Sequence, residues 1–191
     1  QAILDAYLGK CPEKFVYEGR EYTPKSFAAS LGLDFDDYVS ITSYTHHPFY
    51  TSFFIEAPYK WRPRLSYNVP IDTLMNIIDT ALDKGYNVCW GDDVSGNGFD
   101  RQGLAQEKTE PTQKLRQQRF DSWDATYDHV MLIYGKAVDK YGRKYYMVKN
   151  SWGDTGTYHG IWYMRDKYIA LNTTYIFLNR HALTAETFHT Q

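Results

Sequence analysis

A histidine and an asparagine, His129 and Asn150, stand 21 residues apart and carry the side chains needed to activate a thiol. The thiolate is the nucleophile, and an unperturbed cysteine is mostly protonated at neutral pH. An adjacent imidazole can take that proton, and an amide oxygen can fix the tautomer and direction of the imidazole. His129 and Asn150 therefore suit the roles of base and orienting group beside a nucleophilic cysteine.

The segments around this pair are predicted to form two antiparallel strands. Apolar side chains occupy both faces of residues 129–138, and residues 144–149 form a second such run. Between them, residues 139–143 have the composition of a turn, because Gly142 can adopt positive φ. Directly opposed side chains on neighbouring strands lie about 5 Å apart, so we expect His129 and Asn150 to come within hydrogen-bonding distance.

Several segments of the chain resemble a known family. The stretch KYYMVKNSWGDTGTYHGIWYMRDKY, from residue 144, is similar to the asparagine segment of papain-fold peptidases. The segments SYTHHPFY at 43–50, SYNVPIDTLMNIIDTALDKGYNVCWGDDVSGNGF at 66–99 and RQQRFDSWDATYDHVM at 116–131 resemble the bleomycin hydrolase and aminopeptidase C branch. The resemblance runs from about Tyr7 to about Leu183 and matches the C-terminal part of that family.

The resemblance implies an α+β, papain-like cysteine peptidase fold, here its C-terminal portion, with an antiparallel β half-barrel and a few helices. It implies that His129 and Asn150 are catalytic and that Trp152 packs over their hydrogen bond and excludes water. It further implies peptide substrates, no cofactor or metal, a homo-hexamer and a cytoplasmic location. The family's nucleophilic cysteine and oxyanion glutamine precede the matching part, so we expect an N-terminal half of the same protein to supply them.

Three positions depart from the family pattern. Val130 follows the histidine where the family usually has glycine, and Tyr127 stands where it has Asp or Thr. Gly96 replaces the glutamate that ends the family's Trp-Gly-x-Asp-Val-Ser-Glu segment. A β-branched residue beside the histidine is expected to narrow the cleft. Either the substrate preference has changed, or the site is no longer under catalytic constraint.

Neither cysteine of the chain has the sequence context of the nucleophile. Cys89 precedes Trp90, as the papain nucleophile precedes an aromatic residue, but the family nucleophile begins a long helix, where the helix dipole lowers the thiol pKa. Cys89 instead ends a predicted strand at 86–90, and the acidic residues after it are expected to raise its pKa. Cys11 lies in a loop. The sequence predicts no disulfide and no zinc-binding Cys/His spacing.

Two further pairs of polar residues are candidate sites with simpler alternatives. His46 and His47 could bind a metal ion, but no third ligand is evident and a structural role in a loop is the alternative. Asp92 and Asp93 could bind a metal ion or a substrate amine, and a charged loop after a strand is the alternative.

Composition excludes several functional classes. The 191 residues carry a net charge of −2, which gives no general attraction to nucleic acid or anionic membranes. Lys114, Arg116 and Arg119 could contact nucleic acid or an acidic partner, although a solvated helix face is the simpler interpretation. No apolar run reaches 18 residues, so no transmembrane helix is expected.

The remaining pattern describes one partial domain over 1–191, with a loop- and helix-rich part at 1–85 and a β-rich part at 86–191. Residues 1–8 are predicted to end a helix that began earlier, which indicates a processed or trimmed chain. Further helices are predicted from Thr23, its N-cap, to about Gly32, after Pro70 up to Gly85, and over 111–120. Residues 91–109 are predicted to be a polar loop, and strands to fill the chain from Asp128 onward, including 161–164 and 174–179.

Two functions remain open. The chain is either the histidine- and asparagine-bearing part of a thiol aminopeptidase, inactive alone, or a catalytically dead binding or assembly module that keeps the fold. An additional cysteine-bearing polypeptide in the purified protein would favour the enzyme. A complete 22.4 kDa gene product would favour the module.

Overall fold

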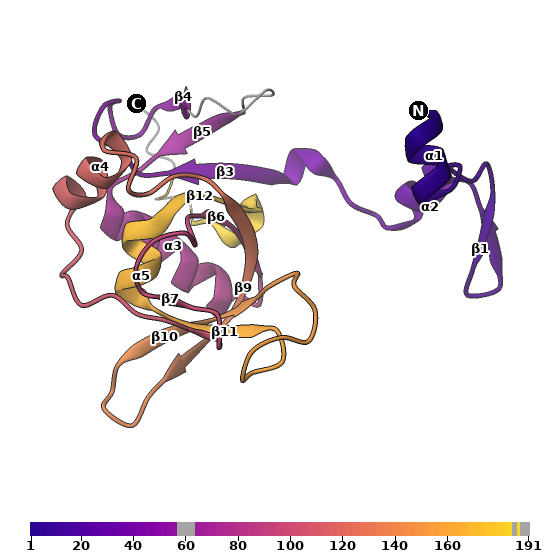
Figure 1. Ribbon diagram of the computed structural model, residues 1–191. Helices are drawn as coiled ribbons and strands as arrows, with labels where there is room; N and C mark the ends of the chain where they lie inside the picture. The colour runs from indigo at the N-terminus through magenta and orange to yellow at the C-terminus, as the bar shows by residue number, and fades with distance from the viewer. Residues whose placement is uncertain (57–63, 185–186, 188–191) are drawn as a thin grey trace. The chain divides into compact units, whose positions relative to one another are not determined.

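The computed structural model describes residues 1–56, 64–184 and 187 (Figure 1). The chain divides into two compact units, Gln1–Asp36 and Asp37–Gln191. The single partial domain expected from the sequence stays a prediction. None of the helices among the described residues is long and apolar enough to cross a membrane.

The first unit is small, and its second helix begins at the residue that the sequence predicts. It contains α1 (Ala2–Leu8), β1 (Phe15–Tyr17), β2 (Arg20–Tyr22) and α2 (Pro24–Ser30). Thr23 caps α2: its Oγ1 accepts a hydrogen bond from Ser26 N at 3.1 Å, and Ser26 Oγ accepts one from Thr23 N at 2.9 Å. Phe27 of α2 packs edge-on against aromatic rings of the hairpin. The predicted N-cap is therefore confirmed.

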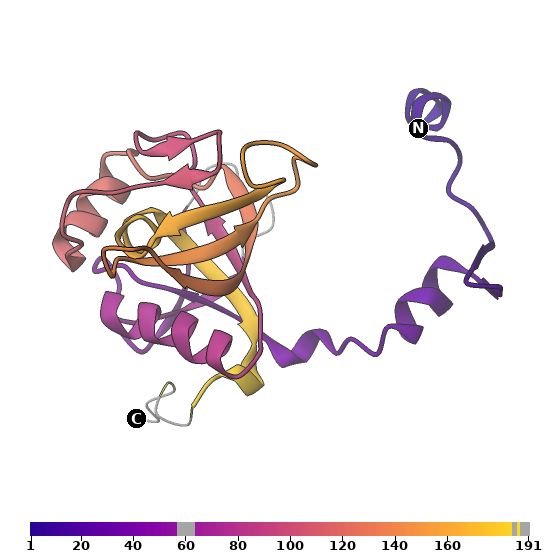
Figure 2. The ribbon, with the colours of Figure 1, turned by 90° about the horizontal axis from the view of Figure 1, so that it is seen from below.

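The second unit is built on one large sheet with helices packed against it (Figure 2). Its strands are β3 (Tyr38–Thr42), β4 (Ser52–Phe54), β5 (Leu65–Asn68), β6 (Val88–Asp92), β7 (Phe99–Asp100), β8 (Leu104–Ala105), β9 (His129–Val138), β10 (Lys144–Lys149), β11 (Ile161–Arg165) and β12 (Thr173–Asn179). Its helices are α3 (Ile71–Asp83), α4 (Gln113–Asp121) and α5 (Asp166–Asn172), with a short 3₁₀ turn at Arg180–Ala182. Another 3₁₀ turn, Phe35–Asp37, includes the boundary between the two units.

The sheet is larger than the sequence suggested and is mixed. In the described residues its strand order is β4-β5-β3-β12-β6-β9-β10-β11-β8-β7. The β3/β5 and β11/β8 pairs are parallel, and the other neighbours are antiparallel. The expected α+β class is confirmed. The prediction of loop and helix before residue 85 is corrected by β3, β4 and β5. Short strands β7 and β8 also interrupt the predicted polar loop at 91–109.

Helix α3 matches its prediction, whereas α5 was missed. The buried side of α3 consists of Ile71, Leu74, Ile77, Ile78 and Ala81, the spacing of an amphipathic helix. Helix α5 interrupts the region that was predicted to be strands alone. Residues 168–172 of α5 are all buried, so this short helix has no solvent-exposed face in its last five residues. Apolar periodicity cannot identify a helix that is buried all round.

Helix α4 does not present the solvated basic face that the sequence suggested. Arg116 is 1% exposed, and its guanidinium donates to Ser43 O at 2.7 Å and Ala170 O at 2.9 Å. Arg119 pairs with Glu107 at 2.8 Å. Only Lys114 of the three is exposed. The basic run is therefore mainly structural, because Arg116 supplies donors to buried carbonyl groups of β3's C-terminal end and α5.

We expect Arg116→Ala to lower the free energy of unfolding of the second unit by about 2–4 kcal/mol. It leaves a cavity, removes the guanidinium donor from Ala170 O, and leaves Ser43 O, among the described residues, with only the longer bond from Gln113 Nε2 at 3.4 Å. Lys114→Ala, on the exposed side of the same helix, should change it by less than about 0.5 kcal/mol. Urea unfolding followed by tryptophan fluorescence measures both, since all five tryptophans lie beyond residue 36. Equal effects of the two variants would contradict the structural role of Arg116.

Candidate active site

An irregularity in the pairing of β9 and β10 controls the geometry of the histidine–asparagine pair. Met147 lies opposite Gly135, but Val148 lies opposite Ile133. Tyr134 is therefore an extra residue in β9, a β-bulge. Because side chains alternate between the two faces of a strand, a shift of one residue exchanges the faces that meet across the pair.

The bulge brings Asn150 to the face of the sheet that carries His129. Lys149 is opposite Leu132, so continuing the register by one residue places Asn150 beside Met131. Met131 and His129 share a face of β9, since they are two residues apart. The predicted direct opposition of His129 and Asn150 is therefore wrong in detail: the contact is diagonal, and long polar side chains reach across such diagonals.

The two side chains form the expected hydrogen bond, at 2.8 Å between His129 Nε2 and Asn150 Oδ1. The same Oδ1 accepts the backbone N–H of Ser151 at 2.7 Å. A backbone N–H only donates, so the amide must present its oxygen here, and His129 Nε2 must carry the proton. In the neutral ring Nδ1 then holds the lone pair, and Nδ1 is the nitrogen able to take a proton from a thiol.

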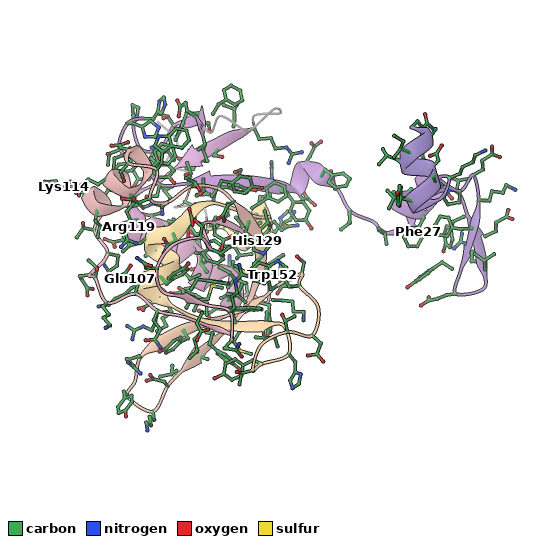
Figure 3. All side chains as sticks on the ribbon, viewed as in Figure 1. Phe27, Glu107, Lys114, Arg119, His129 and Trp152 are labelled. Carbon is green, nitrogen blue, oxygen red and sulfur yellow. The ribbon has the colours of Figure 1, made fainter. Side chains whose placement is uncertain are left out.

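Trp152 lies over the imidazole, as the sequence suggested (Figure 3). The two ring centroids are 5.0 Å apart with the planes at 28°. Trp152 also meets Trp162 edge-on at 5.7 Å and Phe99 at 6.0 Å, so buried and half-buried aromatic rings hold it in place. Asn150 is only 3% exposed, and a hydrogen bond screened from water in this way is electrostatically stronger than an exposed one.

A close backbone contact anchors Asn150, and sequence reasoning missed its importance. Asn150 N donates to Gly160 O at 3.1 Å, which closes the loop between β10 and β11. Gly160 has φ of +79°, and a Cβ there would lie 2.3 Å from Gly153 O and 2.8 Å from Lys149 Nζ. Only glycine fits both the left-handed conformation and the contact. A glycine ten residues after the asparagine was the available signal.

We expect Gly160→Ala to destabilise the protein more than Gly142→Ala does, and to displace Asn150. Gly142 has φ of +75° with no atom within 4 Å of an added Cβ, so its substitution isolates the conformational cost of about 1–2 kcal/mol. Gly160→Ala adds a collision with backbone. Urea unfolding measures the difference, and the ¹⁵N chemical shifts of His129 report the loss of its bond to Asn150. Unchanged His129 shifts in Gly160→Ala would contradict this account.

Asp92 is buried directly beside the pair. It is the register partner of His129 across β6 and β9, and it is 0% exposed. Neither carboxyl oxygen has a hydrogen-bond partner among the described residues. Burial, together with the negative charges of Asp128 and Asp93, raises the pKa of Asp92 to about 9. The carboxyl group is therefore neutral at pH 7, in contrast to the charged loop residue considered from the sequence.

Asp93 has the opposite character. Its Oδ1 accepts from Ser95 N and Oγ, and its Oδ2 accepts from Thr126 N and Oγ1. Burial acts to raise its pKa, but these hydrogen bonds outweigh it and lower the pKa below the usual value. Asp93 thus fixes the chain before β9. The Asp92 carboxyl has no hydrogen-bond partner among the described residues, whereas both oxygens of Asp93 are engaged by Ser95 and Thr126, so the two acids do not form a shared metal- or amine-binding pair.

The raised pKa of Asp92 predicts a pH dependence of stability. Between the unfolded pKa of about 3.9 and the folded value of about 9, the folded protein holds a proton that the unfolded chain releases. The free energy of unfolding should therefore fall as pH rises through this window. Asp92→Asn should remove this part of the slope, and exposed Asp124→Asn should keep it. Parallel profiles for wild type and Asp92→Asn in urea unfolding would show that Asp92 is not protonated.

The cysteines lie away from the imidazole or in the other unit. Cys89 is the register partner of Leu132, on the face of the sheet opposite to that of Trp90 and His129. Burial is the main cause that raises the pKa of the Cys89 thiol. Cys11 is exposed in the first unit, outside any helix or strand.

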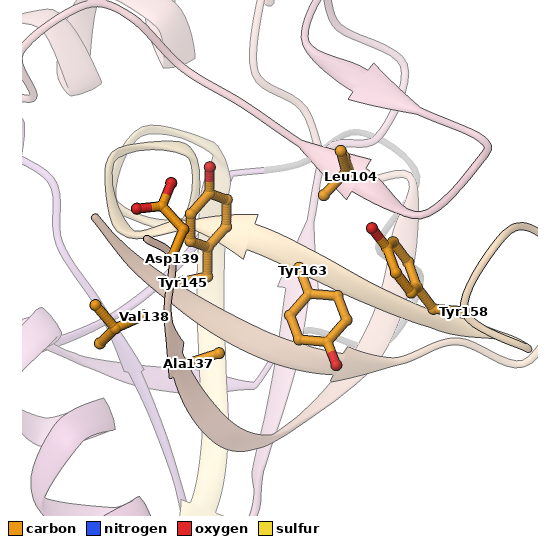
Figure 4. A pocket seen from close by; sticks show the side chains of 7 residues that line it. All are labelled: Leu104, Ala137, Val138, Asp139, Tyr145, Tyr158 and Tyr163. Carbon is orange, nitrogen blue, oxygen red and sulfur yellow. The ribbon is translucent and has the colours of Figure 1, made fainter. Parts of the chain in front are cut away.

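A surface pocket of about 270 Å³ lies at the far end of β9 (Figure 4). His129 begins β9, whereas the pocket is formed where β9 ends, so the pocket is not part of the candidate site. Its lining residues are Leu104, Ala137, Val138, Asp139, Tyr145, Tyr158 and Tyr163. His46 and His47, in the loop after β3, are joined by Glu56, a third group that the sequence pattern did not reveal.

The mixed sheet with its covering helices and the histidine–asparagine–tryptophan arrangement are those of the papain-like fold. Comparison with solved structures agrees. PepW from Lactobacillus rhamnosis HN001 matches 97% of this chain and 47% of its own, with a TM-score of 0.77 and 25% sequence identity. Aminopeptidase C of Lactobacillus delbrueckii subsp. lactis is 26% identical over 192 residues, which cover 87% of this chain and 42% of that protein.

The family model of the Peptidase C1-like family matches residues 7–190, and the chain belongs to this family. The chain spans less than half the length of the two relatives named above.

Proposed function

We propose that this chain is the histidine- and asparagine-bearing part of a thiol aminopeptidase of the bleomycin hydrolase type, inactive by itself. The observation that carries the proposal is the 2.8 Å bond between His129 Nε2 and Asn150 Oδ1 beneath Trp152. It leaves Nδ1 of His129 as the proton acceptor. Family membership and the similarity to an aminopeptidase C support the reaction class.

The reaction needs a thiol at Nδ1 of His129. His129 takes the thiol proton, and the thiolate attacks the peptide carbonyl carbon to form a tetrahedral intermediate. The imidazolium then donates its proton to the leaving amine as the peptide bond breaks, which leaves a thioester. Water hydrolyses the thioester to a carboxylic acid and restores the thiol, with His129 again serving as the base. Asn150 keeps the imidazole aligned throughout.

An external cysteine suits this site better than Cys89. Cys89 lies on the opposite face of the sheet, and its raised pKa disfavours a thiolate. Trp152, which stacks on His129, is 39% exposed, so apolar surface borders the imidazole. A cysteine-bearing N-terminal half of the same protein would cover such surface. By resemblance to the family, we further propose a cytoplasmic homo-hexamer acting on peptides.

Activity with and without an upstream segment tests the proposal. The 191-residue chain should not hydrolyse an aminoacyl fluorogenic substrate. A longer protein that includes the preceding segment should hydrolyse it, and a thiol-blocking reagent should stop the reaction. In that longer protein, His129→Ala should lower kcat by about 10²–10⁴-fold, the usual contribution of a general acid–base group. Exposed His181→Ala should leave kcat unchanged.

Two outcomes would overturn this proposal. Thiol-dependent hydrolysis by the 191-residue chain that Cys89→Ala abolishes would show that the chain carries its own nucleophile. A longer protein that contains a cysteine near His129 and still has no activity would favour the binding or assembly module.

A further inference from the structure

A second group of polar side chains converges on one point: His46 and His47 lie in the loop between β3 and β4, and Glu56 follows β4. His46 Nε2 lies 3.1 Å from Glu56 Oε2, and His47 Nε2 lies 2.9 Å from Glu56 Oε1. One ligand atom of each residue lies within 4.8 Å of the others. The group shares no residue with the His129–Asn150 pair. We propose that His46, His47 and Glu56 form a binding site for a zinc ion.

The chain that carries the two histidines is held firmly. Asn68, 0% exposed, donates through Nδ2 to the carbonyl oxygens of Tyr44, His47 and Pro48 at 2.8, 3.0 and 3.1 Å. Its Oδ1 accepts Tyr44 N at 2.9 Å. One buried amide therefore fixes the backbone on both sides of His46. Ligands fixed before metal binding lose little conformational entropy when the ion arrives.

The two imidazole rings are also fixed. His46 stacks on Phe120 with an interplanar angle of 9°, and His47 stacks on Phe53 at 23°. Phe53 belongs to β4 and Phe120 to α4, so regular elements orient both rings. The rings direct their Nε2 atoms to the two oxygens of one carboxylate, so three potential ligands meet at one place.

Gln117 satisfies the second nitrogen of His46 in either tautomer. Its Nε2 lies 3.1 Å and its Oε1 3.4 Å from His46 Nδ1. A zinc ion on Nε2 needs the proton on Nδ1, which can then be donated to the amide oxygen. Metal-binding histidines usually make such an outer hydrogen bond. Gln117 is itself held, because its Nε2 donates to Asp121 Oδ1 at 2.8 Å.

The donor set and its spacing suit zinc. Two imidazole nitrogens and one carboxylate, with a fourth position open to water, are a common zinc set. Ligand atoms about 2.05 Å from a tetrahedral ion are about 3.3 Å from each other. Each histidine contacts a different oxygen of Glu56, and one ligand atom of each residue lies within 4.8 Å of the others, so side-chain rotations must bring both nitrogens and one oxygen around the ion. The His46, His47 and Glu56 side chains are 29%, 35% and 58% exposed, which leaves a path for the ion. Magnesium and calcium prefer sites made of oxygen.

The alternative is a proton-linked cluster without metal. Partial burial disfavours the Glu56 charge, but hydrogen bonds from His47 and His46 outweigh this and lower the Glu56 pKa. In such a cluster, the hydrogen bonds from His46 and His47 to Glu56 would stabilise the loop without a metal ion. The two interpretations differ in whether micromolar zinc binds and stabilises the protein.

Titration of the metal-stripped chain with zinc chloride, followed by calorimetry and by competition with a chromophoric chelator, tests the site. We expect one ion per chain and a rise in Tm with zinc concentration. His46→Ala, His47→Ala and Glu56→Gln should each weaken binding by at least about 10–100-fold, and Gln117→Ala by about 10-fold. Magnesium should not compete. Bound cobalt should give the visible absorption of a tetrahedral ion.

Two matched variants exclude other ligands. His159 pairs with Asp154 at 2.7 Å, a histidine–carboxylate pair that lacks the second histidine, so His159→Ala should keep full affinity. Cys11 is an exposed thiol, and Cys11→Ser should keep it too. Binding that survives His46→Ala and His47→Ala, or that Cys11→Ser removes, would overturn the proposal. So would the absence of zinc binding in the wild-type chain.

Discussion

The register between β9 and β10 is the constraint on which the candidate site depends. The bulge at Tyr134 places Asn150 on the face of the sheet that carries His129, and the close approach of Gly160 keeps Asn150 at the end of its strand. The hydrogen bond between the two side chains then fixes the tautomer of the imidazole. Trp152 stacks on the ring in this orientation. One extra residue in one strand thus determines which nitrogen of His129 accepts a proton.

The protein also buries several polar atoms that have no hydrogen-bond partner among the described residues. The Asp92 carboxyl oxygens, Asn150 Nδ2 and one guanidinium nitrogen of Arg116 have no hydrogen-bond partner in the described part of the chain. Each such group costs stability, commonly about 1–3 kcal/mol. Unsatisfied groups of this kind concentrate at functional sites. Two of the three residues adjoin the histidine–asparagine contact, whereas Asp93, one residue from Asp92, is fully hydrogen-bonded and supports the loop.

Local chemistry in the sequence predicted the elements that local interactions determine. The Thr23 cap, the apolar spacing after Pro70 and the glycine turn at 142 each depend on neighbours within a few residues, and each appears in the structure. The motif around Asn150 predicted its contact with His129.

The features that could not be predicted from the sequence depend on contacts between residues from different elements. Helix α5 is surrounded by core, Arg116 is buried by contacts with Ser43 and Ala170, and Glu56 meets the two histidines from beyond β4. The bulge could not be predicted, because an extra residue leaves no composition signal in an apolar strand.

The bulge also predicts where related chains can change length. Residues 139–143 connect β9 and β10 at the end of the hairpin remote from His129, so an added or lost residue there alters only a turn. Adding or removing one residue between His129 and Tyr134 would instead turn the imidazole to the opposite face from Asn150. Natural variation in length should therefore collect at the hairpin tip. The number of residues from the histidine to the bulge, six, should stay constant in related chains even where the residue types differ.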